Sequence, residues 1–279
     1  MSAPRILVFD SGVGGLSITQ CIHQSLPSAR LVYLADNACF PYGDQPEALV
    51  TERCLRLIED SLKVYPSQLI VVACNTASTV VLPHLRAMTH LPVVGVVPAI
   101  KPAAAVSKNR RIGLLATPAT IRRAYLDRLV DEFAADCELH RVGHSELVRW
   151  IESWVAGEPL PDAALAEVLA PFRDARVDTV VLGCTHYPLI AEHLQGVLPD
   201  VPYWVDSGEA IARRTSDLLR RAGYMVAESR NGPALDAMLF SGKVPAGIQQ
   251  FLPRLGLEAE RFLGDWPIAA SAPTAIGST

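Results

Sequence analysis

Two cysteines, Cys74 and Cys184, each end a short apolar run and are followed at once by polar residues. The first lies in VVACNTAS at residues 71–78, and the second lies 110 residues later in VVLGCTHYP at residues 180–188. The pKa of a cysteine falls readily near a helix N-terminus or a cation, so such a thiol can act as an acid or base near neutral pH. The repeated arrangement therefore suggests two groups of like chemistry in one site.

From the residues alone, several uses of these cysteines are open. A buried structural thiol is the ordinary role of a cysteine in a Val-rich run. A metal site could begin from Cys184 and His186, but no C-x-x-C pair supports a closed zinc site. A dithiol redox pair would usually have closer spacing. An acid/base pair suits racemisation, in which one thiolate removes a proton from one face of a carbon and one thiol returns a proton to the other.

The stretch DSGVGGLSI at residues 10–18 is a glycine-rich turn between an expected strand and an expected helix. It is not G-x-G-x-x-G and no G-K-[ST] follows, so it indicates neither a dinucleotide nor a nucleoside triphosphate. It is either a tight turn with close helix packing or a place where backbone N–H groups bind a small carboxylate. Asp10 would then be a carboxylate in the cleft, able with Glu152 and His186 to tune the two thiols.

Short Val/Ile/Leu-rich runs alternate with amphipathic helical segments along the chain. Such continuous apolar strands are typical of parallel sheets in an α/β fold. The expected strands are 5–9, 30–35, 68–73, 91–97, 110–116, 178–183 and 202–206. Helices are expected at 46–65, 146–154 and 207–224, and the chain after residue 207 is expected to be mainly helical, with a loose end in 265–279.

Two pairs of segments resemble each other in the same order. RILVFDSGVGGL at 5–16 pairs with RIGLLATPATI at 111–121, and the two cysteine segments form the second pair. The nearly equal offsets predict a duplicated α/β unit. Because ligands of open α/β sheets bind at the carboxyl ends of strands, two facing units would bring both cysteines to one cleft.

The composition predicts a soluble cytoplasmic protein. The formal net charge is −4, with 25 Lys and Arg against 29 Asp and Glu, which does not favour nucleic-acid binding. The N-terminus lacks the features of a signal peptide, and no apolar window is long enough for a membrane span. Six scattered cysteines in 279 residues do not suggest a disulfide framework.

Seven segments together resemble the aspartate/glutamate racemase family, and within it the glutamate racemases. They are VFDSGVGGLS, FPYGD, VVACNTAS, VGVVPAIKPA, LLATPATI, WIES and VVLGCTHYPLI. The resemblance runs in order from residue 5 to about residue 224 and continues weakly through 238–264 as the family's terminal helical segment. CNTAS and GCTHYPL, when they occur together, are highly specific for this family.

This resemblance implies two similar α/β domains with mainly parallel sheets, related by pseudo-two-fold symmetry, with the active-site cleft between them. We expect residues 1–97 and 208–279 in the first domain and residues 98–207 in the second. It implies racemisation of glutamate with no cofactor and no metal, to supply D-glutamate for peptidoglycan. It also suggests a possible homodimer without nucleic-acid or membrane partners.

The resemblance also implies the roles of individual residues. Cys74 and Cys184 would be the acid/base pair, with Asp10 assisting the first, and Glu152 and His186 the second. The substrate-binding positions would be Asp10, Ser11, Tyr42, Gly43, Asn75, Thr76, Thr120, Thr185 and His186, with Thr117 a weaker match and Asp36 an acid near the cleft.

Some positions depart from the family pattern. Ala35 replaces the usual glycine before Asp36, while Ala119 and Arg122 replace a frequent glycine and serine. These changes touch the rim of the cleft and bear on substrate preference, so an aspartate or hydantoin racemase is an alternative. A non-catalytic small-anion-binding or regulatory protein is another. Because the chain begins four residues before its first strand, regulation by a peptidoglycan precursor is not assumed.

Overall fold

The computed structural model describes residues 3–224 and 232–267. Its strands are β1 (Arg5–Asp10), β2 (Arg30–Ala35), β3 (Leu69–Val72), β4 (Val93–Gly95), β5 (Arg111–Ala116), β6 (Glu138–Gly143), β7 (Thr179–Leu182), β8 (Tyr203–Val205), β9 (Leu235–Phe240) and β10 (Phe262–Leu263). The α-helices are α1 (Leu16–Ser25), α2 (Glu47–Val64), α3 (Asn75–Met88), α4 (Ile100–Val106), α5 (Pro118–Ile121), α6 (Ala124–Phe133), α7 (Leu147–Val155), α8 (Asp162–Asp174), α9 (Ala191–Val197), α10 (Gly208–Arg221) and α11 (Ile248–Phe251). The 3-10 turns are η1 (Asn37–Cys39), η2 (Tyr42–Asp44), η3 (Tyr187–Ile190) and η4 (Leu252–Leu255).

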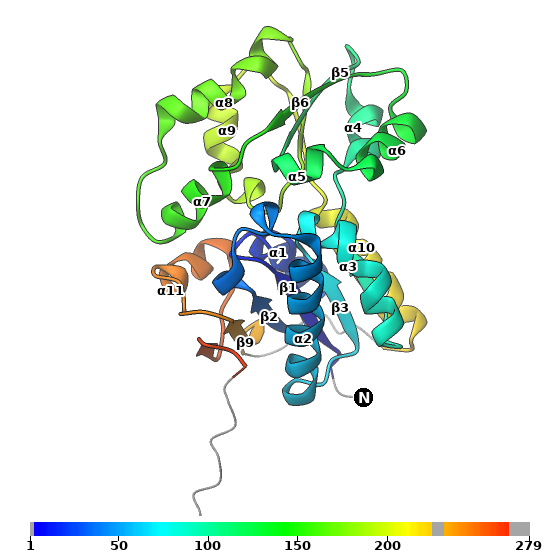
Figure 1. The fold of residues 1–279 in the computed structure, drawn as a ribbon, viewed down its shortest axis with the longest axis vertical. Helices are drawn as coiled ribbons and strands as arrows, with labels where there is room; N and C mark the ends of the chain where they lie inside the picture. Colours follow the sequence, from blue (N-terminus) through cyan, green and yellow to red (C-terminus); the bar gives the residue numbers. More distant parts are fainter. Residues whose placement is uncertain (1–2, 225–231, 268–279) are drawn as a thin grey trace, which may run out of the picture.

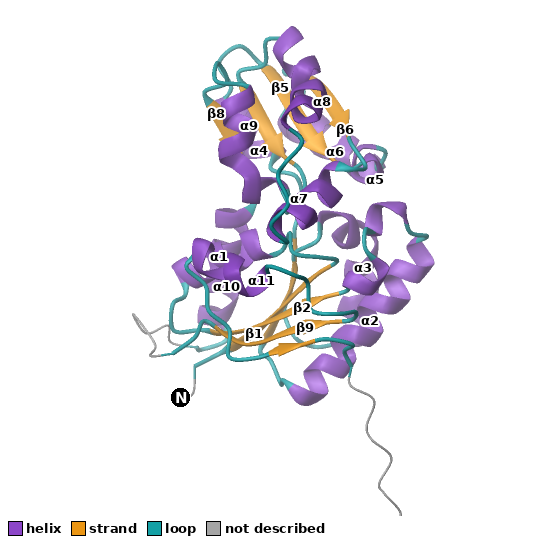
Figure 2. Ribbon diagram, turned by 90° about the vertical axis from the view of Figure 1, so that its left-hand side faces the viewer, coloured by secondary structure: helices purple, strands orange, loops and turns teal. Residues whose placement is uncertain are grey.

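The described strands form two parallel sheets, which Figures 1 and 2 show one above the other. The first has the order β10-β9-β2-β1-β3-β4 and the second the order β6-β5-β7-β8. All recorded strand pairs in both sheets are parallel. The core order β2-β1-β3-β4 of the first sheet recurs in the second as β6-β5-β7-β8. The predicted fold class, with two similar parallel α/β units, is therefore confirmed.

Helices cover both faces of each sheet, which explains why the strands are continuously apolar. Figure 2 shows α1 and α10 on one face of the first sheet and α2 and α3 on the other. In the second, α4 and α6 cover one face and α7, α8 and α9 cover the other. Among the described helices, none has both the length and the apolar character that crossing a bilayer would need.

The repeat places the two cysteines at equivalent points of the two sheets. Arg5 and Arg111 open β1 and β5 and lie 106 residues apart, while β3 and β7 begin 110 residues apart. Cys74 comes two residues after the end of β3, and Cys184 comes two residues after the end of β7. Since equivalent strands end at the same edge of each sheet, the offset seen in the sequence becomes a symmetric pair of positions in space.

The structure corrects the expected helical content of the C-terminal segment. β9 pairs with β2, and β10 pairs with β9, so residues 235–240 and 262–263 extend the first sheet. Every residue of β9 is buried, and LDAMLF contains Leu and Met, which are as common in helices as in strands. Strand β6 was also missed, because its edge position leaves ELHRVG without an apolar run.

The structure confirms the three predicted helices, whereas the predicted domain boundaries are not tested by it. The helices predicted at 46–65, 146–154 and 207–224 are present as α2, α7 and α10. The last one is followed by Gly223 at φ 84, a left-handed residue typical of a helix C-terminus. The domain boundaries at residues 97 and 207 stay a prediction. The expected loose end falls mostly in 268–279, outside the described residues.

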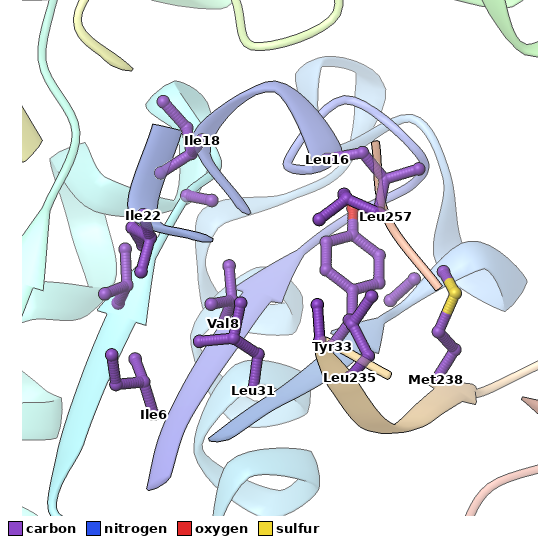
Figure 3. Close-up of a cluster of buried hydrophobic side chains, with 14 of the residues drawn as sticks. Ile6, Val8, Leu16, Ile18, Ile22, Leu31, Tyr33, Leu235, Met238 and Leu257 are labelled. Atoms are coloured by element: carbon purple, nitrogen blue, oxygen red, sulfur yellow. The ribbon is translucent and has the colours of Figure 1, made fainter. Parts of the chain in front are cut away.

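Tyr33 on β2 connects the hydrophobic core to the loop that follows β1. Figure 3 shows its ring among Leu16, Leu235 and Leu257, and the ring is fully buried. Its hydroxyl donates a hydrogen bond of 2.6 Å to the backbone oxygen of Gly12. The core of the first sheet therefore holds the glycine-rich loop in place by one buried hydrogen bond.

We expect Tyr33→Phe to lower the free energy of unfolding by about 1–3 kcal/mol, because the buried Gly12 carbonyl loses its donor while the packing of the ring is kept. Urea denaturation measures the change. Tyr65→Phe is the control, because Tyr65 is a half-buried tyrosine whose ring packs on Trp266. Equal stability of the Tyr33 variant and the wild type would contradict the role given to this hydrogen bond.

Candidate active site

A cleft with about 420 Å³ of empty space, its open mouth included, lies where the carboxyl ends of the two sheets face each other. Both cysteines line it, Cys74 at 6% and Cys184 at 7% exposure. The predicted residues that line it are Ser11, Tyr42, Gly43, Cys74, Asn75, Thr76, Cys184, Thr185 and His186, together with Thr117. The structure therefore brings residues separated by more than a hundred positions to one small space.

Cys74 is the N-cap residue of α3. Its Sγ accepts a hydrogen bond from the Ala77 backbone N–H at 3.5 Å and lies 3.7 Å from Ser11 Oγ. Burial and the nearby charge of Asp10 outweigh these two contacts and raise the pKa of Cys74 to about 12. The helix N-terminus does lower the pKa of Cys74 through the Ala77 N–H, but desolvation of the thiolate is the larger effect. The expectation of a lowered pKa is therefore wrong for this thiol.

Asp10 ends β1 and lies behind the cleft, fully buried. Its carboxylate accepts hydrogen bonds from the Gly12 N–H at 2.9 Å and from Thr185 Oγ1 at 3.1 Å. Burial raises the pKa of Asp10 to about 6, although the charge of His186 and the hydrogen bond from Gly12 act in the opposite direction. Asp10 thus joins the first sheet to the loop after β7.

Cys184 has a different set of neighbours. Its Sγ lies 3.8 Å from His186 Nδ1, and His186 Nε2 lies 2.7 Å from Glu152 Oε1. Burial lowers the pKa of His186, but the interactions with Cys184 and Glu152 outweigh it and hold this pKa well above the usual value. One thiol of the cleft is therefore next to a buried carboxyl group, and the other is next to a buried imidazolium.

The glycine-rich loop after β1 binds a carboxylate that belongs to the protein itself. Glu152 on α7 accepts a hydrogen bond of 2.7 Å from the Val13 backbone N–H. A Cβ added to Gly12 would lie 2.1 Å from Glu152 Oε1, and one added to Gly14 would lie 2.3 Å from His186 Nδ1. The loop therefore makes a close packing contact, and its Val13 N–H binds the carboxylate of Glu152. Binding of a small carboxylate ligand by this loop stays a prediction.

Hydroxyl and amide groups line the rest of the cleft. Thr117 Oγ1 lies 3.3 Å from Thr76 Oγ1 and 3.0 Å from Thr120 Oγ1, so these three threonines connect α3 with α5. Thr120 lies behind Thr117 and does not itself line the cleft. Asn75 Oδ1 is buried and has no hydrogen-bond partner among the described residues. A buried acceptor without a donor is costly, which marks Asn75 as a group that a ligand can satisfy.

Sequence reasoning missed several lining residues. They are Phe40, Pro41, Asp44, Pro118, Ser145 and Val148. Phe40, Pro41 and Asp44 belong to the FPYGD segment. This motif resembles the family and could have indicated them, but only Tyr42 and Gly43 of the segment are predicted to bind the substrate. Ser145 and Val148 come from the segment after β6, a strand that the sequence does not predict.

Two ion pairs join the units beside the cleft. Arg149 on α7 lies 2.9 Å from Asp44, and Arg123 before α6 pairs with Glu47 at the start of α2. Asp44 lines the cleft, so its pair closes part of the mouth. These pairs are partly exposed, so each contributes on the order of 1 kcal/mol or less to stability.

Among the described residues, Cys184 and His186 have no third side chain placed with them to bind a metal ion. In residues 3–224 and 232–267, no group of three or more His, Cys, Asp or Glu side chains is arranged to hold a metal ion. All six cysteines are free, as the sequence led us to expect.

The sequence profile of the Asp/Glu/Hydantoin racemase family matches residues 6–215, which include both cysteine segments and all the predicted site residues. The chain belongs to this family. Its relatives include glutamate racemase from Shewanella loihica, 50% identical over 78% of this chain and 82% of that protein, and glutamate racemase from Klebsiella pneumoniae, 46% identical over 90% and 88%.

Solved structures of family members agree with the fold. The structure of Escherichia coli glutamate racemase, in complex with L-glutamate and the activator UDP-MurNAc-ala, is 43% identical with a TM-score of 0.83, covering 94% of this chain and 98% of that one. Glutamate racemase RacE1 from Bacillus anthracis is 28% identical with a TM-score of 0.81, covering 96% of this chain and 100% of that one. The chain is therefore an amino-acid racemase of the Asp/Glu/Hydantoin racemase family.

We expect Gly14→Ala to lower the free energy of unfolding by about 1–3 kcal/mol, because the new methyl group would overlap the His186 ring. Gly196→Ala in α9, where an added Cβ would meet nothing within 4 Å, should instead raise it by up to about 1 kcal/mol through helix propensity. Chemical denaturation of both variants tests this. A Gly14→Ala variant as stable as the wild type would mean that the loop can move away from His186 at little cost.

The raised pKa of Asp10 predicts a pH-dependent stability. The folded state binds the proton of Asp10 more tightly than the unfolded state, so stability falls as the pH rises from about 4 to about 6. At 1.36 kcal/mol per pKa unit, the loss approaches about 3 kcal/mol. In Asp10→Asn this loss is absent, so the difference in unfolding free energy between variant and wild type should grow across this interval. Parallel stability curves from pH 4 to 7 would refute the prediction.

Proposed function

We propose that this chain interconverts L- and D-glutamate without a cofactor, using Cys74 and Cys184 as a pair of acid/base groups. The observation that carries this proposal is that both thiols line one cleft from equivalent strand ends of two facing sheets. A single thiol would be enough for hydrolysis or elimination. Inversion at a carbon instead uses one group on each face, and a duplicated unit supplies such a pair.

In the proposed reaction, the thiolate of one cysteine removes the α-proton and becomes a thiol. The electron pair left on the α-carbon is delocalised into the α-carboxylate, which gives a planar carbanion. The thiol of the other cysteine then donates its proton to the opposite face and becomes a thiolate. No electrons are transferred to or from the protein, and the reverse reaction exchanges the two roles.

Different neighbours would assist the two cysteines. His186, held as an imidazolium by Glu152, presents a positive charge 3.8 Å from Cys184 Sγ. Burial raises the pKa of Cys74 to about 12, which favours its thiol form. The α-ammonium group of a bound amino acid would favour its thiolate, because a nearby cation stabilises the charged form. Asp10 would balance this cation and influence the proton on Cys74.

Hydroxyl and amide donors, the His186 imidazolium and a helix N-terminus would bind the two carboxylates of the substrate. Among the described residues that line the cleft there is no lysine and no arginine, and α3 begins at its wall with Asn75 and Thr76. Ser11, Thr185, the His186 imidazolium and the wall segment formed by Tyr42 and Gly43 would complete the site, with Thr120 supporting Thr117. Asn75 Oδ1, a buried acceptor without a partner, suits the α-ammonium group. Preorganised donors of this kind also stabilise the charge of a carbanion.

In the cell, such an activity would supply D-glutamate for peptidoglycan in the cytoplasm. The proposed activity needs no nucleic-acid partner. We propose a homodimer as the assembly. The two domains would be residues 1–97 with 208–279, and residues 98–207.

The deciding experiment follows purified protein with L-glutamate in D₂O, with EDTA and no added cofactor. We expect loss of optical rotation together with α-deuterium in the inverted product. Cys74→Ser and Cys184→Ser should each lower racemisation by roughly 10²–10⁴-fold, because each removes one acid/base group. Cys137→Ser, a thiol outside the cleft, is the control and should retain activity.

Other outcomes distinguish the alternatives. Racemisation of L-aspartate or of a hydantoin in parallel reactions, without glutamate turnover, would keep the mechanism and change the substrate. A wild-type rate in Cys74→Ala would rule out the two-thiol mechanism. Binding of glutamate without deuterium exchange would favour a small-anion-binding protein.

A further inference from the structure

The carboxylate of Asp36, just after β2, lies at the centre of a hydrogen-bond network outside the cleft. Asp36 is fully buried. Arg53 on α2 donates to both of its oxygens, from Nε at 2.6 Å and from Nη2 at 2.5 Å. Tyr42 Oη donates to Oδ2 at 2.6 Å and Ser241 Oγ donates to Oδ1 at 2.5 Å. Four N–H and O–H groups of Arg53, Tyr42 and Ser241 thus donate hydrogen bonds to the carboxylate of Asp36.

The hydroxyl of Tyr42 is directed into this network. Tyr42 is 2% exposed, and its Oη also lies 3.6 Å from Cys54 Sγ. The hydroxyl is therefore occupied by Asp36 and Cys54, and it serves to hold the η2 segment rather than to bind a ligand. Because Tyr42 and Gly43 line the cleft, the position of this part of the wall depends on the charge of Asp36.

The same network anchors the start of the loop. Ser241 Oγ accepts a hydrogen bond from the Ala38 N–H at 3.0 Å, and Asn37 Oδ1 accepts one from the Gly242 N–H at 2.8 Å. The residues that follow β9 therefore support the loop from residue 36 to residue 44 on one side. Arg53 supports it from α2 on the other.

Arg53 is the only cation bonded to Asp36 among the described residues. Its side chain is 32% exposed and lines a separate hollow with Arg56 and Trp266. Without the guanidinium, the buried carboxylate would lose two of its four donors and its charge would be uncompensated. The carboxylate would then favour a position closer to water, which would displace the Tyr42 and Ser241 hydroxyls that are bonded to it.

We propose that Arg53 is a positioning residue that acts through Asp36 and Tyr42 to hold the Tyr42–Gly43 segment of the cleft in its substrate-binding position. The inference rests on the proposed function, since it takes this segment as part of the glutamate site. Arg53 itself does not touch the substrate. Its loss should therefore weaken substrate binding more than it slows the proton transfers.

Arg53→Lys and Arg53→Ala test this role, with Arg56→Ala as the control from the same helix and the same hollow. We expect KM for glutamate to rise about tenfold in Arg53→Lys, with kcat within about threefold of the wild type, because lysine cannot make the two parallel bonds. Loss of folded protein alone would lower kcat and leave KM unchanged. Arg56→Ala should leave both constants unchanged.

Two further measurements test the route through Tyr42. The effects on KM of Tyr42→Phe and Arg53→Lys should not add in the double variant, because both disturb the same contact. Guanidinium chloride at low millimolar concentration should lower the KM of Arg53→Ala, since the hollow beside Arg53 is open, and it should not change that of Arg56→Ala. Additive effects, or a KM of Arg53→Lys equal to that of the wild type, would overturn the proposal.

Hydrogen exchange separates this inference from the proposed function. Amide protection of residues 40–44 should fall in both Arg53 variants and stay unchanged in Arg56→Ala, whether or not the wild type turns over glutamate. An inactive wild-type protein would refute the proposed function alone. Unchanged protection of residues 40–44 in the Arg53 variants would refute the positioning role.

Discussion

The Glu152 carboxylate is the interaction on which the rest of the cleft depends. It is carried by α7 of one unit, accepts a hydrogen bond from the Val13 N–H of the other, and holds His186 beside Cys184. The contact requires the backbone after β1 to approach very closely, which explains Gly12 and Gly14 at these positions. The geometry around one thiol therefore depends on a loop of the opposite unit.

The two halves of the site are symmetric in backbone and asymmetric in charge. Each cysteine comes two residues after an equivalent strand, in sheets with the same core order. Cys74 nevertheless has Asp10 and Ser11 as neighbours, whereas Cys184 has His186. A reaction that needs one thiol and one thiolate at a time benefits from this difference, since identical surroundings would favour the same protonation state in both.

Burial determines how strongly these charges act. Asp10 and His186 are almost completely excluded from water, and the pKa values of both are raised, the first by desolvation and the second by its partners. Asp36 is equally buried, but the paired bonds from Arg53 compensate its charge. The same low-polarity interior thus holds two different acidic groups. Asp10 can take up a proton, whereas the carboxylate of Asp36 anchors the cleft wall.

The sequence by itself determined the α/β class, the repeat and the two cysteines, because buried parallel strands leave apolar runs and the motifs follow directly after them. It did not reveal β6, whose edge position removes the apolar signal, nor β9, whose LDAMLF run suits a helix as well as a strand. It also led to the wrong direction for the pKa of Cys74, since a helix N-terminus is visible in a sequence and desolvation is not. Tertiary structure alone decided the contacts of Glu152 with Val13 and of Arg53 with Asp36. These contacts join residues distant along the chain, and only the packing of the sheets sets their distances and their burial.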